Sequence, residues 1–198
     1  MLSNFLALLA TIALPMNDTE LLARAKALEP AALRAMHERF YGQVARYIQF
    51  KVGDPATVED LTGEVFVRAL EGLRRGQGWQ ESPGGWIMGI ARHVVTDHYR
   101  RQEKMKEVEL DERIAASDEA GPSQHALRNE RTHQLMQAIQ QLTEEQRDVI
   151  LLRFMEGIDI SGVARALNKT PGAIKALQFR AMRTLAELLP SHSLEDTV

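Results

Sequence analysis

A segment near the C-terminal end of the chain gathers five cations and contains no carboxylate. Residues 160–186 hold no Asp or Glu, although the 198-residue chain has 27 of them against 24 Lys and Arg, for a net charge of −3. On a helix, cationic side chains bind phosphates or read base edges in the DNA major groove, where a carboxylate would be repelled by the phosphate backbone. The segment is a candidate DNA-binding site, and a solvated basic face is the alternative. The five cations are Arg165, Lys169, Lys175, Arg180 and Arg183.

Two short helices are expected to position these cations. The first spans about 159–167, and the second begins at Pro171 and ends near Leu189, with Thr170 as its N-cap. Ala164 is small enough to let the two helices cross closely. Two helices, a short turn and a small residue at the crossing are typical of a helix-turn-helix. The apolar seam between the helices would be formed by Val163, Leu167, Ile174 and Leu177.

A second group of cations lies among aromatic residues in 85–102. The helix that carries it is expected to begin with Ser82 as N-cap and Pro83 as its first residue. Cations combined with aromatic rings suit a single DNA strand whose bases have left the stack. Core packing explains Trp86 equally well, whereas Trp79, in the Gly-rich segment 74–85, is harder to explain as core. The group consists of Trp86, Arg92, His93, Tyr99, Arg100 and Arg101.

An acidic patch is expected on the helix that begins at Pro55. An acidic rim around an apolar centre is what a basic protein partner would fit. From these residues alone, an ordinary amphipathic helix is the stronger interpretation. The acidic residues are Glu59, Asp60 and Glu64, and the apolar ones are Leu61, Val65 and Phe66.

Apolar residues recur at three- and four-residue steps along most of the chain, and strand-like alternation does not occur. We therefore predict an all-α fold of two small helical domains joined by a flexible acidic linker. The periodicity fades after Arg101 and resumes near residue 126, beyond a Gly-Pro-Ser breaker. This places the first domain at 16–102, the linker at 103–127, the second domain at 128–190 and a tail at 191–198.

Residues 1–15 form an apolar N-terminal extension. No Lys or Arg precedes the apolar run, and it is shorter than the ~20 residues that span a bilayer. After Pro15, residues Asn17 or Asp18 would cap a new helix. Two interpretations stay open: Met16 is the true start of the protein, which we favour, or the extension is a weak hydrophobic anchor or partner-binding helix. Stable membrane insertion is not expected.

The composition argues against several other classes of protein. The chain has no cysteine, which excludes disulfides and thiolate metal sites and fits a cytoplasmic location. Its six histidines do not show a metal-ligand spacing, so neither a metal nor a cofactor is expected. We find neither a nucleophile–base constellation nor a phosphate-binding GxxxxGK[ST] loop. The protein is therefore not expected to be an enzyme or to have a small-molecule substrate.

Three blocks of the sequence together resemble the bacterial RNA polymerase sigma factors, particularly the extracytoplasmic-function (ECF) subfamily of the sigma-70 family. They are "EDLTGEVFVRAL" (59–70), "GWIMGIARHVVTDHYRRQ" (85–102) and "LTEEQRDVILLRFMEGIDISGVARALNKTPGAIKALQFRAMRTL" (142–185). They occur in the order and spacing of the family, and the resemblance covers about Thr19 to Leu189. It implies a region 2-like domain followed by a region 4-like helix-turn-helix domain.

The resemblance also implies a function for each block. The first would bind core RNA polymerase through Glu59, Asp60, Leu61, Thr62, Glu64, Val65 and Phe66. The second would open and read the downstream (minus-ten) promoter element through Trp86, Arg92, His93, Asp97, Tyr99, Arg100 and Arg101. The third would recognise the upstream (minus-thirty-five) element through Arg165, Lys169, Thr170, Lys175, Ala176, Gln178, Phe179, Arg180 and Arg183. The chain would thereby direct strand opening and transcription initiation.

Some alternatives stay open at this point. Family members commonly have Asn in place of His93, and many have a basic residue at Leu177 and an apolar one at Gln178, which leaves the rotation of the second helix undetermined. In the free protein, the resemblance implies that the two domains close on each other or on an anti-sigma factor. A stand-alone helix-turn-helix regulator and a protein-interaction module that never binds DNA are the rival functions.

Overall fold

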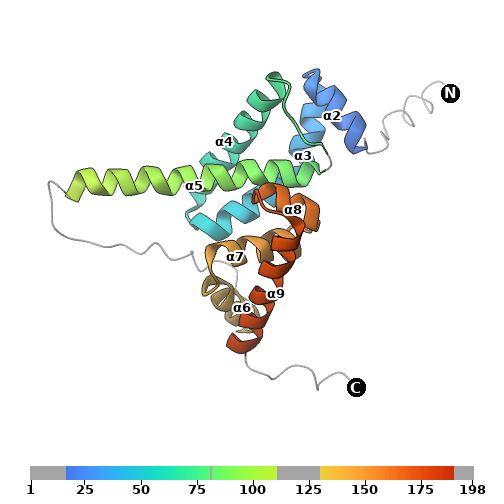
Figure 1. Cartoon of the computed structure of the whole chain (residues 1–198). Helices are drawn as coiled ribbons and strands as arrows, with labels where there is room; N and C mark the ends of the chain where they lie inside the picture. The colour runs from blue at the N-terminus through green and yellow to red at the C-terminus, as the bar shows by residue number, and fades with distance from the viewer. Residues whose placement is uncertain (1–16, 81, 111–129, 190–198) are drawn as a thin grey trace, which may run out of the picture.

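The computed structural model describes residues 17–80, 82–110 and 130–189, and every regular element in them is helical (Figure 1). The expected N-terminal extension, most of the expected linker and the expected tail lie outside these residues. The first half contains α2 (Asp18–Lys26), α3 (Pro30–Val52), α4 (Pro55–Arg74) and α5 (Pro83–Leu110). The second contains α6 (Glu130–Gln140), α7 (Glu144–Ile150), a π-helical turn η1 (Leu151–Met155), α8 (Ile160–Ala166) and α9 (Pro171–Leu188).

The helices begin where the capping residues predict. The Asn17 side chain accepts from the Glu20 amide at 2.9 Å, and Ser82 Oγ accepts from the Gly85 amide at 3.0 Å. Thr143 and Gln146 form a reciprocal capping box at the start of α7. These bonds satisfy amide groups that a helix cannot pair internally. Local sequence therefore determines most helix starts.

In the first half, α2 to α5 pack around a shared apolar core. Val44, Val65 and Val94 contribute to it from three different helices and are fully buried. Trp79 also belongs to this core: only 3% of it is exposed, and its indole N–H donates to the Asp18 carbonyl at 3.1 Å. The expectation that Trp79 is poorly explained as core is wrong, because a backbone acceptor on α2 pairs with its polar group.

In the second half, α8 and α9 form the predicted helix-turn-helix. The N-cap of α9 is Thr170, whose hydroxyl accepts from the Ala173 amide at 3.2 Å, and Pro171 is its first residue. The four residues of the predicted seam are buried, and Leu185 joins them in the core. Helix α7 continues directly into η1, and Gly157, two residues beyond η1, has a φ of +67°, where a glycine is favoured.

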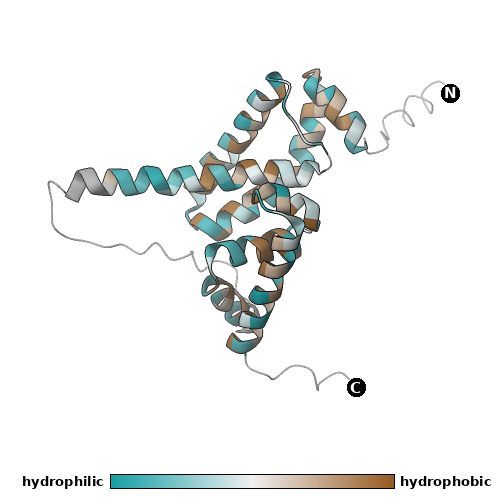
Figure 2. Ribbon diagram, in the orientation of Figure 1, coloured by the Kyte–Doolittle hydropathy of each residue, from teal (hydrophilic) through white to brown (hydrophobic). Residues whose placement is uncertain are grey.

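Helix α5 continues past the point where the periodic pattern fades. It extends to Leu110, eight residues into the segment expected to be a linker. Residues 101–105 are all exposed, and Figure 2 shows this part of the helix as hydrophilic. The apolar period is missing there because the helix has no buried face, whereas Glu, Lys and Met are good helix formers.

The two halves pack against each other, mainly through α5 and α8 (Figure 1). A Cβ on Gly85 of α5 would lie 2.6 Å from the Cα of Gly162 in α8, so both backbones approach without a side chain between them. A Cβ on Gly84 would similarly meet Ile158 at 2.7 Å. Glycines at these positions allow the close approach. In the described residues, no helix has the length and apolarity required to cross a membrane.

Candidate nucleic-acid interface

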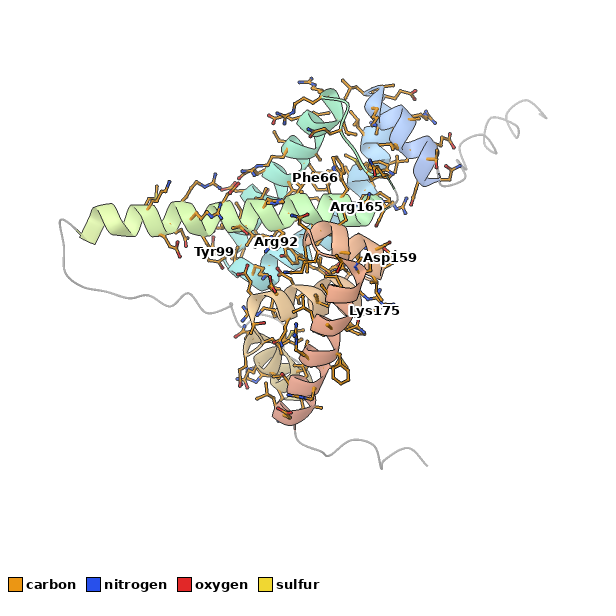
Figure 3. All side chains as sticks on the ribbon, in the orientation of Figure 1. Phe66, Arg92, Tyr99, Asp159, Arg165 and Lys175 are labelled. Atoms are coloured by element: carbon orange, nitrogen blue, oxygen red, sulfur yellow. The ribbon has the colours of Figure 1, made fainter. Side chains whose placement is uncertain are left out.

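The outer face of α9 carries the cations that the sequence singles out. Lys175, Phe179, Arg180 and Arg183 are exposed, with 70% of Phe179 accessible to solvent. Figure 3 shows Lys175 pointing away from the first half of the chain. Arg183 pairs at 3.4 Å with Glu187, which lies one turn further along α9 and is the first residue after the carboxylate-free segment. This face remains free to meet a partner while the two halves are packed together.

The rotation of α9 about its axis follows from its buried residues. Ile174, Leu177 and Ala181 face the core, so Leu177 cannot occupy the position of an outward basic residue. Ala176 is exposed beside Lys175. Gln178 lies at the flank: it is partly buried, and its Oε1 has no hydrogen-bond partner among the described residues.

The remaining predicted upstream contacts lie away from this face. Lys169 is partly buried and pairs with Glu145 at 2.7 Å. Thr170 is exposed but its hydroxyl is used as the helix cap. Arg165 is on α8, where Figure 3 places it beside α5. The structure therefore brings together the α9 residues and separates Arg165 from them.

On α5, the predicted residues lie between the first turn and the middle of the helix. Trp86 is partly buried and packs on Trp79, with 5.8 Å between ring centroids. His93 is exposed, with its Nδ1 2.8 Å from the Gly89 carbonyl. Tyr99 is 41% exposed, and its hydroxyl donates to the Lys51 carbonyl at 2.6 Å. Burial raises the pKa of Tyr99, so that its hydroxyl keeps its proton and remains a donor.

Towards the far end of α5, cations surround a depression in the surface. Asp97 lines it together with three exposed cations of the same helix, Arg100, Arg101 and Lys104. Arg68 of α4 donates to Asp97 at 2.7 Å, and this hydrogen bond lowers the pKa of the Asp97 carboxyl. Arg101 pairs with Glu64 at 3.3 Å. Asp97 is thus committed to α4, whereas the cations face solvent.

The predicted polymerase-binding residues divide into an outer and an inner face of α4. Glu59 and Asp60 are exposed, and Glu64 is partly exposed. Leu61, Thr62 and Val65 are buried in the core, with Val65 fully inaccessible. Their burial leaves almost nothing of these three side chains on the surface for a partner to contact.

An aromatic cluster on the outer face of α3 and α4 was not predicted from the sequence. Phe66 is partly buried, lies 4.6 Å from His37 and stacks on Tyr41 at 6.3 Å between ring centroids. Tyr41 is 43% exposed and Val67 57% exposed. An i, i+4 spacing on α3, paired with one aromatic residue on α4, is the only sequence signal for this cluster.

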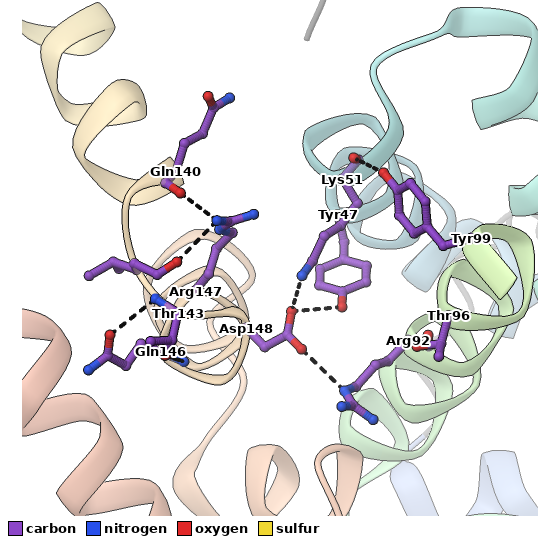
Figure 4. A network of polar contacts seen from close by, with 11 residues as sticks. Tyr47, Lys51, Arg92, Thr96, Tyr99, Gln140, Thr143, Gln146, Arg147 and Asp148 are labelled. Carbon is purple, nitrogen blue, oxygen red and sulfur yellow. Dashed lines mark hydrogen bonds and ion pairs between the residues drawn. The ribbon is translucent and has the colours of Figure 1, made fainter. Parts of the chain in front are cut away.

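A buried polar cluster at the contact between the halves was also missed (Figure 4). Asp148 of α7 is fully buried and accepts from Tyr47 at 3.1 Å and from Arg92 at 3.2 Å. Lys51 Nζ lies 2.6 Å from the same carboxylate. Burial, together with the Asp148 charge, raises the pKa of Tyr47 well above its ordinary value. Arg92, a predicted DNA contact, is therefore bound to the other half.

A second ionic contact joins the halves. Arg46 of α3 pairs with the buried Glu156 carboxylate at 2.7 Å, and Gln43 donates to the Glu156 carbonyl at 3.0 Å. Glu156 immediately follows η1, so the π-helical turn ends at this contact.

Comparisons with known proteins identify both halves. Residues 36–105 match the family described as Sigma-70 region 2, and residues 132–185 match Sigma-70, region 4. The chain is 38% identical over 172 residues to the ECF RNA polymerase sigma factor BldN of Streptomyces coelicolor. That match covers 86% of this chain but only 65% of the relative, just under two thirds of its length.

A further sequence relative and a solved structure are similar to the chain. The ECF RNA polymerase sigma factor SigX of Bacillus subtilis is 28% identical over 171 residues, covering 82% of this chain and 88% of SigX. The structure of the sigma factor RpoE with the anti-sigma factor NepR from Bartonella quintana shares the fold, with a TM-score of 0.61 and 18% identity. That alignment covers 79% of this chain and 96% of RpoE. The chain belongs to the sigma-70 family of RNA polymerase sigma factors, in its ECF subfamily.

Proposed function

We propose that the chain binds core RNA polymerase and directs it to promoters, where it contacts two DNA elements and promotes strand opening. The observation that carries this proposal is the exposed cationic face of α9 in a chain whose two halves match regions 2 and 4 of one family. A stand-alone regulator would have no need of a region 2 half. The protein would act in the cytoplasm as a specificity subunit without catalytic activity of its own.

Polymerase docking is assigned to the outer face of α4 and the adjoining part of α3. Glu59 and Asp60 supply exposed negative charge, and Phe66 with Tyr41 supplies an apolar surface beside it. Exposed aromatic residues with charged neighbours are typical of interface centres and rims. His37 completes this docking surface by its contact with Phe66.

Upstream recognition is assigned to Lys175, Ala176, Phe179, Arg180 and Arg183, because these residues share the exposed side of α9. Cations on this helix would contact phosphates and base edges in the major groove, and Phe179 would contact a thymine methyl. Downstream recognition is assigned to the exposed face of α5, where His93, Arg100 and Arg101 are accessible. An anti-sigma partner is proposed by analogy with the RpoE–NepR complex.

Co-purification with core polymerase, followed by runoff transcription on genomic fragments, tests this function. The parent chain should bind core and yield discrete transcripts. The double variant Lys175→Glu, Arg180→Glu should still bind core but lose these transcripts. A matched control, Lys26→Glu with Arg74→Glu, makes the same charge change at exposed positions of α2 and of the last turn of α4. Failure of the parent chain to bind core at low ionic strength would refute the proposed function.

A further inference from the structure

The cluster around Asp148 has an uneven distribution of donors and charge. All three donors, Tyr47, Lys51 and Arg92, come from the first half, and the carboxylate is the single contribution of the second half (Figure 4). Two cations thus converge on one anion. The Lys51 side chain is only 7% exposed and that of Asp148 is completely buried. Charges at such depth require a partner of opposite sign.

This arrangement makes the donors an anion-binding site rather than a simple ion pair. When the halves separate, Asp148 is withdrawn while the three donors stay together, because α3 and α5 belong to the same bundle. The site then has two positive charges and a hydroxyl donor directed at one point. An ammonium and a guanidinium together are a common way to bind a phosphate oxyanion.

The position of the site selects its ligand. Arg92 is on α5, in the same helix as the exposed His93, Arg100 and Arg101. A DNA strand that follows this helix would bring its backbone to Arg92 and Lys51. We propose that Tyr47, Lys51 and Arg92 bind a backbone phosphate of the promoter strand, and that Asp148 occupies this site as an internal competitor in the closed chain. The proposal rests on the proposed function, since it takes the promoter strand as the ligand.

The packing of α8 on α5 prevents a DNA strand from reaching the site while Asp148 occupies it. At Gly85 and Gly162 the two backbones leave no room for even a Cβ, so DNA cannot pass between them while the halves are closed. Opening must therefore precede binding of a strand at Arg92. The closed chain is self-inhibited at this site, and the α9 face is left exposed.

Closure can be measured directly because the chain has no cysteine. Dyes attached through Arg74→Cys in α4 and Ala186→Cys in α9, both exposed positions, would report the separation of the halves by single-molecule energy transfer. Asp148→Asn should shift the population towards larger separations. Glu144→Gln, an exposed carboxylate on the same helix, makes the same charge change and should leave the distribution as in the parent chain.

A second variant opens the halves without touching the anion site. In Gly85→Ala the added methyl group clashes with the Gly162 backbone, while alanine favours the helix itself. It should also shift the chain to the open form. If Asp148→Asn does not fold, judged by its circular dichroism, Gly85→Ala takes its place in the binding experiments.

Phosphate binding is then measured with a fluorescein-labelled oligothymidylate, without polymerase, by anisotropy at several salt concentrations. The opened variants should bind at least about threefold tighter than the parent, as expected when at most a third of the parent chain is open. Adding Lys51→Gln to an opened variant should remove this gain and reduce the slope of log affinity against log salt by about 0.7, the value of one single-strand phosphate contact. Lys26→Gln, an exposed control in α2, changes the same charge elsewhere.

Two results would overturn the proposal. If neither Asp148→Asn nor Gly85→Ala increases the separation of the halves, or if neither increases the affinity for the oligothymidylate, Asp148 is not a competitor. If Lys51→Gln leaves the salt slope of the opened chain unchanged, or lowers it no more than Lys26→Gln does, the cluster does not bind phosphate. Because this assay contains no polymerase, either outcome is distinct from a failure of the chain to bind core enzyme.

Discussion

Arg68 of α4 and Asp97 of α5 form an ion pair, with 2.7 Å between Nη1 and Oδ2, and Arg68 also bonds Glu64 at 2.5 Å. The pair joins the helix proposed to dock on polymerase to the helix proposed to meet the promoter strand. It also gives Asp97, which the sequence suggested as a DNA contact, a role within the protein. Because Arg68 neutralises Asp97, this carboxylate is compatible with the DNA-binding role proposed for α5.

Replacing Asp97 with Asn should destabilise the fold in a pH-dependent way. The hydrogen bond from Arg68 lowers the pKa of Asp97 in the folded chain, so the pair stabilises the fold above the unfolded pKa of about 4 and loses this effect as the pH falls through the lowered folded value. The pair is partly exposed, so the loss at pH 7 should be at most about 1 kcal/mol. Urea unfolding of parent and variant at pH 7 and near pH 2.5 measures it, and an equal difference at both pH values would contradict the assignment.

Removing the N-cap of α9 should weaken the second half without altering its outer face. Thr170→Ala loses the hydroxyl that accepts from the Ala173 amide, at a cost of about 1 kcal/mol in the free energy of unfolding. Thr170→Ser retains the acceptor and should be close to the parent. Chemical denaturation followed by circular dichroism compares the three proteins, and equal stability of all three would show that the cap is not needed.

Substitution of Phe179 should weaken promoter binding while leaving the stability of the fold almost unchanged. Because 70% of it is exposed, Phe179→Ala should change the free energy of unfolding by no more than about 0.5 kcal/mol. Its loss from the recognition face should nevertheless weaken promoter binding by the polymerase complex. Its neighbour on the inner side, Leu177, offers the contrast: Leu177→Ala should cost about 2–5 kcal/mol. Thermal melts and gel-shift titrations of both variants test this, and unchanged promoter affinity of Phe179→Ala would exclude it from the DNA contact.

The two faces of α4 should respond differently to substitution. Asp60→Lys changes an exposed residue and should reduce binding to core polymerase while the fold stays stable. Leu61→Ala, one residue later, should instead destabilise the first half by about 2–5 kcal/mol, because Leu61 is buried. Pull-down with core enzyme and thermal unfolding distinguish the two effects. Normal core binding by Asp60→Lys would argue against this docking surface.

Features set by neighbouring residues could be predicted from the sequence. The caps at Asn17, Ser82, Thr143 and Thr170 act within three residues, and the seam of the helix-turn-helix follows from helical spacing alone. The all-α class follows from the same periodicity. The cations of α9 were recognised because a local absence of carboxylates needs no tertiary information.

Features set by distant residues could not be predicted. Asp148 meets Arg92 and Tyr47 from 56 and 101 positions away, and helical spacing carries no information on such pairs. The inner position of Leu61 and Val65 agrees with the amphipathic-helix interpretation, although the resemblance placed both among the polymerase-binding residues. The apolar residues on the outer face of the same helix are Phe66 and Val67. Trp79 was misjudged because its hydrogen-bond acceptor lies on α2, 61 positions earlier.

The accessibility of α9 in the packed chain has a consequence for the sequence of events at a promoter. Because Lys175, Phe179 and Arg180 stay exposed while Arg92 is engaged by Asp148, the proposed upstream-recognition face would be available to duplex DNA even in the closed chain. Binding of the single strand would then be the later step, possible once Asp148 has left the site formed by Tyr47, Lys51 and Arg92. Contact with duplex DNA would thus precede strand opening, because the buried Asp148 carboxylate must first leave Arg92.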